Sequence, residues 1–225
     1  MSTTNKLKLL TQIVFLCLFI FLLVMGRVQL WMALVLVCII AALILGRFYC
    51  GWICPTNTIM GPFDYLGRKL KIQRRTVPKF LQSGFIRYTI FALFIVILLL
   101  TMTKGVKVPV LPILTLAAVL LTLFFPAALW HRHLCPFGVL LGITGSIAKL
   151  GFRVNPDKCS GCSICQRHCD GNAIQIRNKG DKAEILSSHC LQCNECADRC
   201  PQDAISYTSR PPKTIKQDVY KSQGN

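Results

Sequence analysis

Residues 159–207 contain one pattern twice: CSGCSICQRHCDGNAIQI from Cys159 to Ile176, and CLQCNECADRCPQDAISY from Cys190 to Tyr207. Each stretch has four cysteines in the spacing C-x2-C-x2-C-x3-C, and the two stretches align position by position without a gap. Eight of the 13 cysteines of the chain lie in these two runs. Regular spacing of this density indicates metal ligands and argues against a set of disulfides.

The spacing predicts two [4Fe–4S] clusters. Three cysteines separated by two residues can wrap around one cubane, and the fourth cysteine reaches the neighbouring cluster. Four thiolates can also hold zinc, but the doubled pattern and the proline at position 201 favour iron and sulfide. The expected ligands are Cys159, Cys162, Cys165 and Cys200 for one cluster, and Cys190, Cys193, Cys196 and Cys169 for the other.

Residues Phe152–Tyr207 resemble the bacterial-type two-cluster ferredoxins, which implies a small α+β domain. Asp170 departs from that family, because it stands where the first run normally has proline. Because all eight cysteines are present, we expect Asp170 to shift the redox potential without preventing cluster binding. His168 and His189 each precede a ligand cysteine, and we expect both to be surface residues near the clusters.

The part of the chain before the cysteine runs is much more apolar than the remainder. The whole chain is 53% hydrophobic and 16% charged, with a mean hydropathy of +0.51, which is unusual for a soluble globular protein. The excess lies in four stretches, each close to the length of about 20 residues that crosses a hydrocarbon core as a helix. We expect four transmembrane helices: Leu9–Met25, Leu30–Gly46, Gly84–Met102 and Val110–Trp130.

The predicted fold class is therefore an α-helical membrane domain followed by a small two-cluster ferredoxin domain. The expected boundaries are 1–150 for the membrane domain with its two Cys-Pro loops, 152–208 for the ferredoxin domain, and 209–225 for a polar, disordered tail. The N-terminal apolar run ends in Gly26-Arg27 without a small-residue cleavage site, so we expect it to be a retained span.

Basic residues flank the apolar stretches and carry most of the net charge of +17. The loop after the second stretch is rich in Lys and Arg, whereas the loop after the first has Arg27 alone and the loop after the third has only Lys104 and Lys107. The positive-inside rule places this basic loop, both termini and the ferredoxin domain on the cytoplasmic side of the cell membrane. Because the basic residues border spans and form no groove, we expect membrane lipid as a partner and no nucleic acid.

The apolar half also contains a repeat. The sequence YCGWICP (Tyr49–Pro55) recurs after the fourth stretch as WHRHLCP (Trp130–Pro136), so that each half has a helical hairpin and a Cys-Pro loop. An interfacial helix is expected after each loop. The first is Pro62–Arg75, with Phe63, Leu66 and Leu70 on one face, and the second ends near residue 150. Two parallel repeats imply an axis along the membrane normal.

Three interpretations of the Cys-Pro loops remain open. Cys50, Cys54, His131 and Cys135 can ligate a metal ion or a further Fe–S centre at the membrane face, since imidazole can replace thiolate. Alternatively Cys50 and Cys54 form a redox thiol pair, or the residues only shape the loops. His133 is a further candidate for metal ligation or for a hydrogen bond to quinone. Three tryptophans lie at span ends, where indoles favour the membrane interface: Trp31, Trp52 and Trp130. Of these, Trp52 and Trp130 mark candidate quinone positions.

The combination of GRFYCGWICP, a basic interfacial helix, WHRHLCP and the two-cluster domain resembles the NapH/NosR-type membrane polyferredoxins over essentially the whole chain. In that family both loops usually read C-x3-C-P, whereas here His131 replaces the first cysteine of the second loop. The resemblance implies electron exchange between the membrane quinone pool and a redox partner protein such as a reductase, a cytochrome or a ferredoxin.

The predicted function is electron transfer by a membrane-bound subunit of an oxidoreductase complex. The alternatives are a metalloenzyme assembly factor that reduces a metal, and a redox-sensing regulatory membrane protein. No catalytic residue is assigned, because Asp64 is the only carboxylate side chain before residue 157 and acid–base catalysis in the membrane half is not expected.

Overall fold

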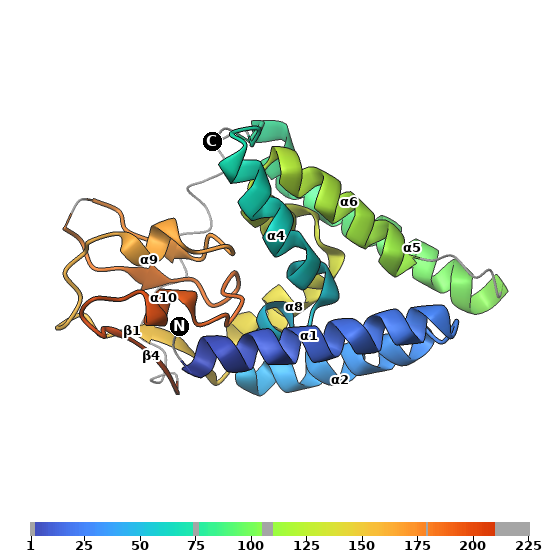
Figure 1. The fold of residues 1–225 in the computed structure, drawn as a ribbon, viewed down its shortest axis with the longest axis horizontal. Coiled ribbons are helices and arrows are strands. Elements are labelled where there is room, and N and C mark those ends of the chain that lie inside the picture. The colour runs from blue at the N-terminus through green and yellow to red at the C-terminus, as the bar shows by residue number, and fades with distance from the viewer. Residues whose placement is uncertain (1–2, 74–76, 105–109, 179, 210–225) are drawn as a thin grey trace.

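The computed structural model describes residues 3–73, 77–104, 110–178 and 180–209. A group of long helices lies beside a smaller segment of short helices and strands (Figure 1). The helical part contains α1 (Thr3–Val24), α2 (Gln29–Leu45), α3 (Phe48–Trp52), α4 (Pro55–Lys69), a 3-10 turn (Lys79–Gln82), α5 (Gly84–Lys104), α6 (Val110–Phe124), α7 (Ala127–Leu129), a π-helical turn (Trp130–Leu134) and α8 (Pro136–Ile147).

Four helices coincide with the four apolar stretches, but they differ in length. In α1 and in the part of α5 from Gly84 to Thr101, length and composition are sufficient to cross a membrane. The other two, α2 and α6, are apolar but have only 17 and 15 residues. The fourth predicted stretch was too long: α6 ends at Phe124, because Pro126 lacks an N–H and restricts the residue before it.

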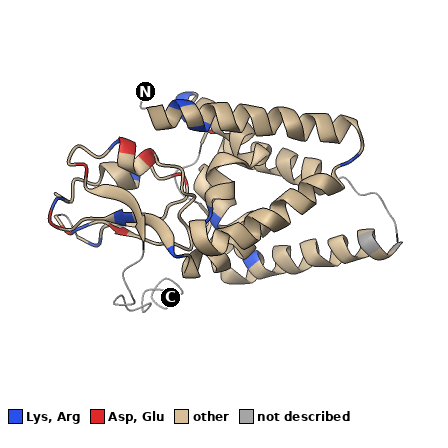
Figure 2. Cartoon of the chain, turned by 90° about the horizontal axis from the view of Figure 1, so that it is seen from below, with Lys and Arg blue, Asp and Glu red and all other residues tan. Residues whose placement is uncertain are grey.

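The long helices expose their apolar side chains. Only 6% of each candidate span is buried inside the protein, whereas a core helix of a soluble protein would be mostly buried. Val24 and Phe85 are 81% and 79% exposed, and similar side chains cover the outer faces of α1, α2, α5 and α6. Charged side chains are scarce along the helix bodies and gather near their ends (Figure 2). The outer surface of this part is therefore suited to lipid.

The helices form two equivalent halves, α1 to α4 and α5 to α8, and each half packs a helix against the other half. The helix after each Cys-Pro loop packs against the apolar helix that precedes the loop of the other half: α4 lies on α6, and α8 lies on α2. Each of these two helices also packs on the first helix of its own half, since α1 packs on α4 and α5 packs on α8. The sequence repeat is thus reflected in a pseudo-two-fold arrangement.

The two helices that follow the loops differ from the expected interfacial helices. The first begins at Pro55, directly after the Cys-Pro loop, and continues through Pro62, while Arg74 and Arg75 lie outside the described residues. Its predicted apolar face, with Phe63 as one member, is exposed as expected of a helix at a lipid surface. By contrast, α8 is largely buried, because it fills the space between α2 and α5.

The smaller segment contains two antiparallel strand pairs and two short helices. β1 (Leu150–Val154) pairs with β4 (Ile205–Ser209), and β2 (Ile174–Gln175) pairs with β3 (Glu184–Ile185). The helices are α9 (Ile164–Arg167) and α10 (Glu195–Asp198). Leu150 pairs with Ser209, so the strand pair extends slightly beyond the predicted domain limits. Residues 210–225 of the predicted tail lie outside the described residues.

Asp64, the lone carboxylate of the apolar half, joins α4 to the end of α6. It is 5% exposed, and its second oxygen contacts the Nη2 of Arg68 at 2.6 Å. The other oxygen accepts hydrogen bonds from Gln73 Nε2 at 2.8 Å and from the Ala127 N–H at 3.3 Å. The same Gln73 amide donates to the carbonyl oxygens of Thr122 and Phe125 at the end of α6. Asp64 therefore stabilises the point where α6 stops.

We predict that Asp64→Ala lowers the thermal unfolding temperature of the detergent-purified chain. Removing one partner from buried donors costs about 1–3 kcal/mol. The matched control is Asp157→Ala, at an exposed position, which should unfold within error of the unchanged chain. Equal unfolding temperatures for the two variants would show that Asp64 does not hold α6 in place.

Candidate metal centres

Two cavities in the smaller segment are each lined by four cysteines. The two cavities are similar in their lining, which consists mainly of cysteines and apolar residues. In each, three cysteines come from one run and the fourth from the other run. The cysteines are Cys159, Cys162, Cys165 and Cys200 around the first cavity, and Cys169, Cys190, Cys193 and Cys196 around the second. The structure thus brings together the same two sets that the spacing grouped.

The backbone around the first cavity is repeated around the second, as the two cysteine runs are in the sequence. Left-handed φ angles occur at Ser163 and Asn194, immediately before α9 and α10, and let the chain turn around each cavity. The Ala173 N–H donates to the Sγ of Cys169 at 3.2 Å, and the Ala204 N–H donates to the Sγ of Cys200 at 3.3 Å. Such hydrogen bonds favour the thiolate form, which is the form that binds a metal.

The donor set of each cavity suits an iron–sulfur cluster. Each cavity is lined by four cysteines, the ligand type that holds [4Fe–4S] clusters. A cubane carries each thiolate on a separate iron, so its ligands stand farther apart than the ligands of one zinc ion. Four cysteines spread around a cavity therefore match the demands of an iron–sulfur cluster.

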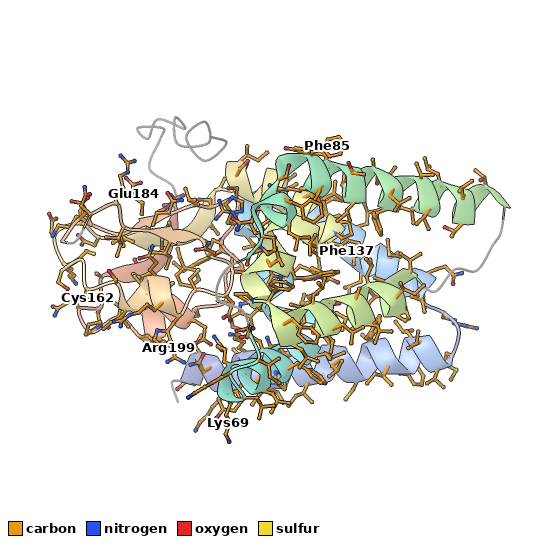
Figure 3. All side chains as sticks on the ribbon, turned by 90° about the horizontal axis from the view of Figure 1, so that it is seen from above. Lys69, Phe85, Phe137, Cys162, Glu184 and Arg199 are labelled. Carbon is orange, nitrogen blue, oxygen red and sulfur yellow. The ribbon has the colours of Figure 1, made fainter. Side chains whose placement is uncertain are left out.

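The second cavity lies against the helical part, and the first faces away from it. A Cβ atom added to Gly51 would lie 2.5 Å from the carbonyl oxygen of Leu191 and 3.2 Å from the Cα of Cys193. Trp52 Nε1 donates to the carbonyl oxygen of Gln192 at 2.8 Å. Cys162, which lines the first cavity, is exposed at the end of the segment remote from the helices (Figure 3).

Further polar contacts fix the smaller segment on the helices. Lys8 Nζ lies 3.0 Å from Glu195 Oε1, and the Tyr207 hydroxyl donates to the Leu45 carbonyl oxygen at 2.9 Å. Burial works to raise the pKa of Glu195, but Lys8 and Arg199 outweigh it and hold the pKa below the ordinary value. The ion pair therefore stabilises docking at neutral pH and is lost as the pH falls through that lowered pKa.

Three residues beside the cysteine cavities have different environments. Burial, with a contribution from Asp64, raises the pKa of Asp170, the residue that replaces proline. His168 is exposed, as expected, and its Nδ1 lies 3.0 Å from the Ile164 carbonyl oxygen. His189 is 5% exposed, so the expectation of a surface residue was wrong: the helical part covers it.

The two Cys-Pro loops have the same local structure. Cys54 precedes α4 and Cys135 precedes α8, each with an extended backbone and a proline in the next position. The Cys54 N–H donates to the Tyr49 carbonyl oxygen at 2.9 Å, and the Cys135 N–H donates to that of Trp130 at the same distance. Proline suits the first position of a helix, where its missing N–H costs nothing.

Three cysteines of the two loops pack together, and a histidine of the second loop is buried. Cys50 is 5% exposed and packs in one core with Cys54 and Cys135. Burial, assisted by the neighbouring cysteines, raises the pKa of the Cys54 and Cys135 thiols to about 12. Burial and Arg47 lower the pKa of His131 to about 3. A metal bound at Cys54 or Cys135 would displace the thiol proton.

Arg47 is the functional residue that sequence reasoning missed, since it counted only as a charge beside a span. Its side chain is 1% exposed. Nη1 donates to the Ser188 carbonyl oxygen at 2.6 Å, Nη2 donates to the His131 carbonyl oxygen at 3.5 Å, and Nη2 lies 4.0 Å from the Cys50 Sγ. In the sequence, only the position of Arg47 between Gly46 and the first Cys-Pro loop indicated that it could contact the loops.

Trp31 and the candidate quinone residues Trp130 and His133 are more enclosed than expected. Trp31 is fully buried and donates to the Tyr49 hydroxyl at 3.1 Å, and Trp130 is 5% exposed, so neither indole lies on the outer surface of the protein. His133 is half-buried on the π-helical turn, and burial, with Arg132 and Arg87, lowers its pKa to about 4. Cys17 is exposed and Cys38 is buried in α2, away from both four-cysteine cavities.

Two family models match the chain. A 4Fe–4S dicluster domain matches residues 158–204, which contain both cysteine runs. A 4Fe–4S binding domain matches residues 28–73 and 108–155, so that one matched segment with its Cys-Pro loop lies in each half of the helical part.

Curated relatives share most of the length of this chain. An uncharacterized protein of Methanocaldococcus jannaschii is 31% identical over 186 residues, which cover 81% of this chain and 72% of that protein. The putative electron transport protein YccM of Escherichia coli is 23% identical, over 83% of this chain and 58% of YccM. The ferredoxin-type protein NapH of Escherichia coli is 25% identical, over 78% of this chain and 67% of NapH.

We predict that Gly51→Ala disturbs the second cavity. The added methyl group meets the Leu191 carbonyl oxygen, so the 188–194 loop must move, and its amides should exchange with deuterium faster. The matched control is Gly61→Ala, where an added Cβ meets nothing within 4 Å. Hydrogen-exchange mass spectrometry of both variants in detergent makes the comparison, and identical exchange of this loop would contradict the close approach.

Proposed function

Because the chain belongs to the NapH/NosR-type ferredoxin family, whose 4Fe–4S domains it contains, we propose that it transfers electrons between a quinone-linked donor in the membrane and a redox partner protein through two [4Fe–4S] clusters. The observation that carries this proposal is the pair of cavities with four cysteines each. We propose Cys159, Cys162, Cys165 and Cys200 as the ligands of one cluster, and Cys190, Cys193, Cys196 and Cys169 as the ligands of the other.

Backbone N–H groups and apolar side chains around the cavities would influence the redox potential of a bound cluster. A bound [4Fe–4S] cluster supplies one-electron chemistry, with a potential that depends on burial and on hydrogen bonds to the sulfurs. The Ala173 and Ala204 N–H groups supply such hydrogen bonds. Ile174 and Ile205 are almost fully buried beside the cysteines and exclude water. Leu191 lines the second cavity and Trp52 contacts the adjacent Gln192 carbonyl oxygen, whereas Cys162 of the first cavity is exposed to solvent.

The membrane arrangement is part of the same proposal. Four membrane-spanning helices, α1, α2, α5 and α6, would place both Cys-Pro loops and the smaller segment at one end of the bundle (Figure 1). The exposed apolar side chains of these helices support this arrangement. The abundance of Lys and Arg in the loop after α2 supports a cytoplasmic position for that end, for both termini and for the cysteine cavities.

The exposure of the two cavities indicates which of them contacts the redox partner protein. The first cavity lies remote from the helices and is the accessible one, so we assign contact with the redox partner protein to this end. The second cavity faces the loops at the membrane and is assigned to the donor side. This division favours an electron-transfer role over a regulatory one, because it offers an entry and an exit.

The cluster ligands can be tested by paired substitutions. We predict that Cys200→Ala removes about four iron and about four acid-labile sulfide from the anaerobically purified chain. Adding Cys162→Ala should remove no more, because both cysteines serve one cluster, whereas adding Cys193→Ala should remove about four more of each. The exposed Cys17→Ala is the control and should keep the full content. Zinc in place of iron, or equal losses in both double variants, would contradict the assignment.

The donor can be tested in liposomes. We predict that a reduced quinone analogue bleaches the visible absorbance of the clusters in the reconstituted chain, or that the oxidised quinone restores it. Arg27→Ala, which alters an exposed basic residue in the loop after α1 and none of the cysteines, serves as the comparison for non-specific effects. Clusters that respond to dithionite and to no quinone would contradict a quinone-linked donor.

A further inference from the structure

Two arginines from distant parts of the chain approach the same point beside Gly142 of α8. A Cβ atom added at Gly142 would lie 3.5 Å from Arg87 Nη2 and 3.9 Å from Arg47 Nη1. Arg87 belongs to the first turn of α5, and Arg47 directly precedes α3. Because guanidinium groups are always charged, two of them at one place repel each other unless a negative group lies nearby.

Neither arginine has a carboxylate partner among the described residues. Arg47 is 1% exposed and Arg87 is half-buried, and the Nε atom of each is buried without a hydrogen-bond partner in the described part of the chain. Asp64, the only carboxylate side chain before residue 157, is paired with Arg68 instead. An unpaired buried charge is costly, and a bound anion would offset that cost.

Further basic groups from other elements surround this point. His189 is 5% exposed, and its Nδ1 has no hydrogen-bond partner among the residues that the structure describes. Burial lowers the pKa of His189 to about 3, with contributions from the nearby Arg132 and Arg47. Burial, Arg132 and Arg87 lower the pKa of His133 in the same way. The arginines therefore create a positive field that attracts an anion.

The outer surface next to these arginines is apolar. Phe85 and Tyr88 flank Arg87 in α5, Ile143 follows Gly142 in α8, and all three apolar residues are more than half exposed. Phe85 lies on the outer side of the helical part, near the smaller segment (Figure 3). Basic groups beside exposed apolar side chains at the end of a membrane helix suit a lipid with a charged headgroup, whereas a free ion gains nothing from apolar neighbours.

We propose that the basic cluster of Arg47, Arg87 and Arg132 binds the phosphate group of an anionic membrane lipid. Arg87 is half-buried and can offer two parallel hydrogen bonds to phosphate oxygens, whereas Arg47 acts from the interior through its charge. The inference goes beyond electron transfer and rests on the proposed membrane arrangement. Because Arg47 also donates to the Ser188 carbonyl oxygen, the bound lipid would stabilise the contact between the helical part and the smaller segment.

Lipid titrations followed by native mass spectrometry test the proposal. We expect the full chain in detergent to bind phosphatidylglycerol more tightly than phosphatidylcholine or inorganic phosphate. Arg87→Gln should weaken phosphatidylglycerol binding about tenfold, because a charged hydrogen bond is lost. The matched control is Lys69→Gln, which removes an exposed charge on the opposite side of the molecule (Figure 3) and should bind like the unchanged chain. Arg87→Lys keeps the charge without the planar fork and should bind with intermediate affinity.

The unchanged chain provides a test that needs no variant. Phosphatidylglycerol should raise its unfolding temperature and slow deuterium exchange in residues 186–189, and phosphatidylcholine should do neither. Equal losses of binding in Arg87→Gln and Lys69→Gln would show non-specific attraction and overturn the site. Equal affinity for the two lipids, or inorganic phosphate bound as tightly, would overturn an anionic lipid as the occupant. A chain that stays soluble without detergent would overturn the membrane arrangement together with the lipid site.

Discussion

The buried guanidinium of Arg47 holds three separate parts of the chain in one place. It lies just before the first Cys-Pro loop, donates to the His131 carbonyl oxygen of the second, and donates to the Ser188 carbonyl oxygen beside the second cysteine run. Gly138 and Gly145 of α8 leave room for it, since a Cβ atom added at these positions would lie 3.2 Å and 2.8 Å from the arginine side chain. Loss of this contact would uncouple the apolar half from the cysteine cavities.

Two internal repeats, one in the apolar half and one in the cysteine runs, meet at this point. Each repeat builds a site from matching backbone segments: the Cys-Pro loops in the helical part, and the paired runs in the smaller segment. Neither half of either repeat contains a whole ligand set. The four-cysteine cavities need one cysteine from the opposite run, and α4 and α8 find their packing partners in the opposite half. The sites therefore depend on both long-range pairings.

Sequence patterns predicted most features that depend on local spacing. The grouping of the eight cysteines, the apolar helices and the family could be predicted because ligand spacing, helix length and loop motifs are local properties. The end of α6 was placed too late, since the effect of Pro126 was outweighed by the apolar residues around it. The burial of Arg47, His189 and Trp31 could not be predicted, because it depends on contacts between segments far apart in the sequence or on helix packing.

The two halves pack against each other as two subunits do in a closed two-fold dimer, but here both halves belong to one chain. In a dimer of identical subunits, every residue near the axis occurs twice, so any ligand there must be duplicated. Covalent fusion of the two copies removes that requirement. Position 50 can then be a cysteine while its counterpart, position 131, is a histidine, and each Cys-Pro loop can face a different neighbour. A single chain can therefore carry an asymmetric centre on a symmetric scaffold.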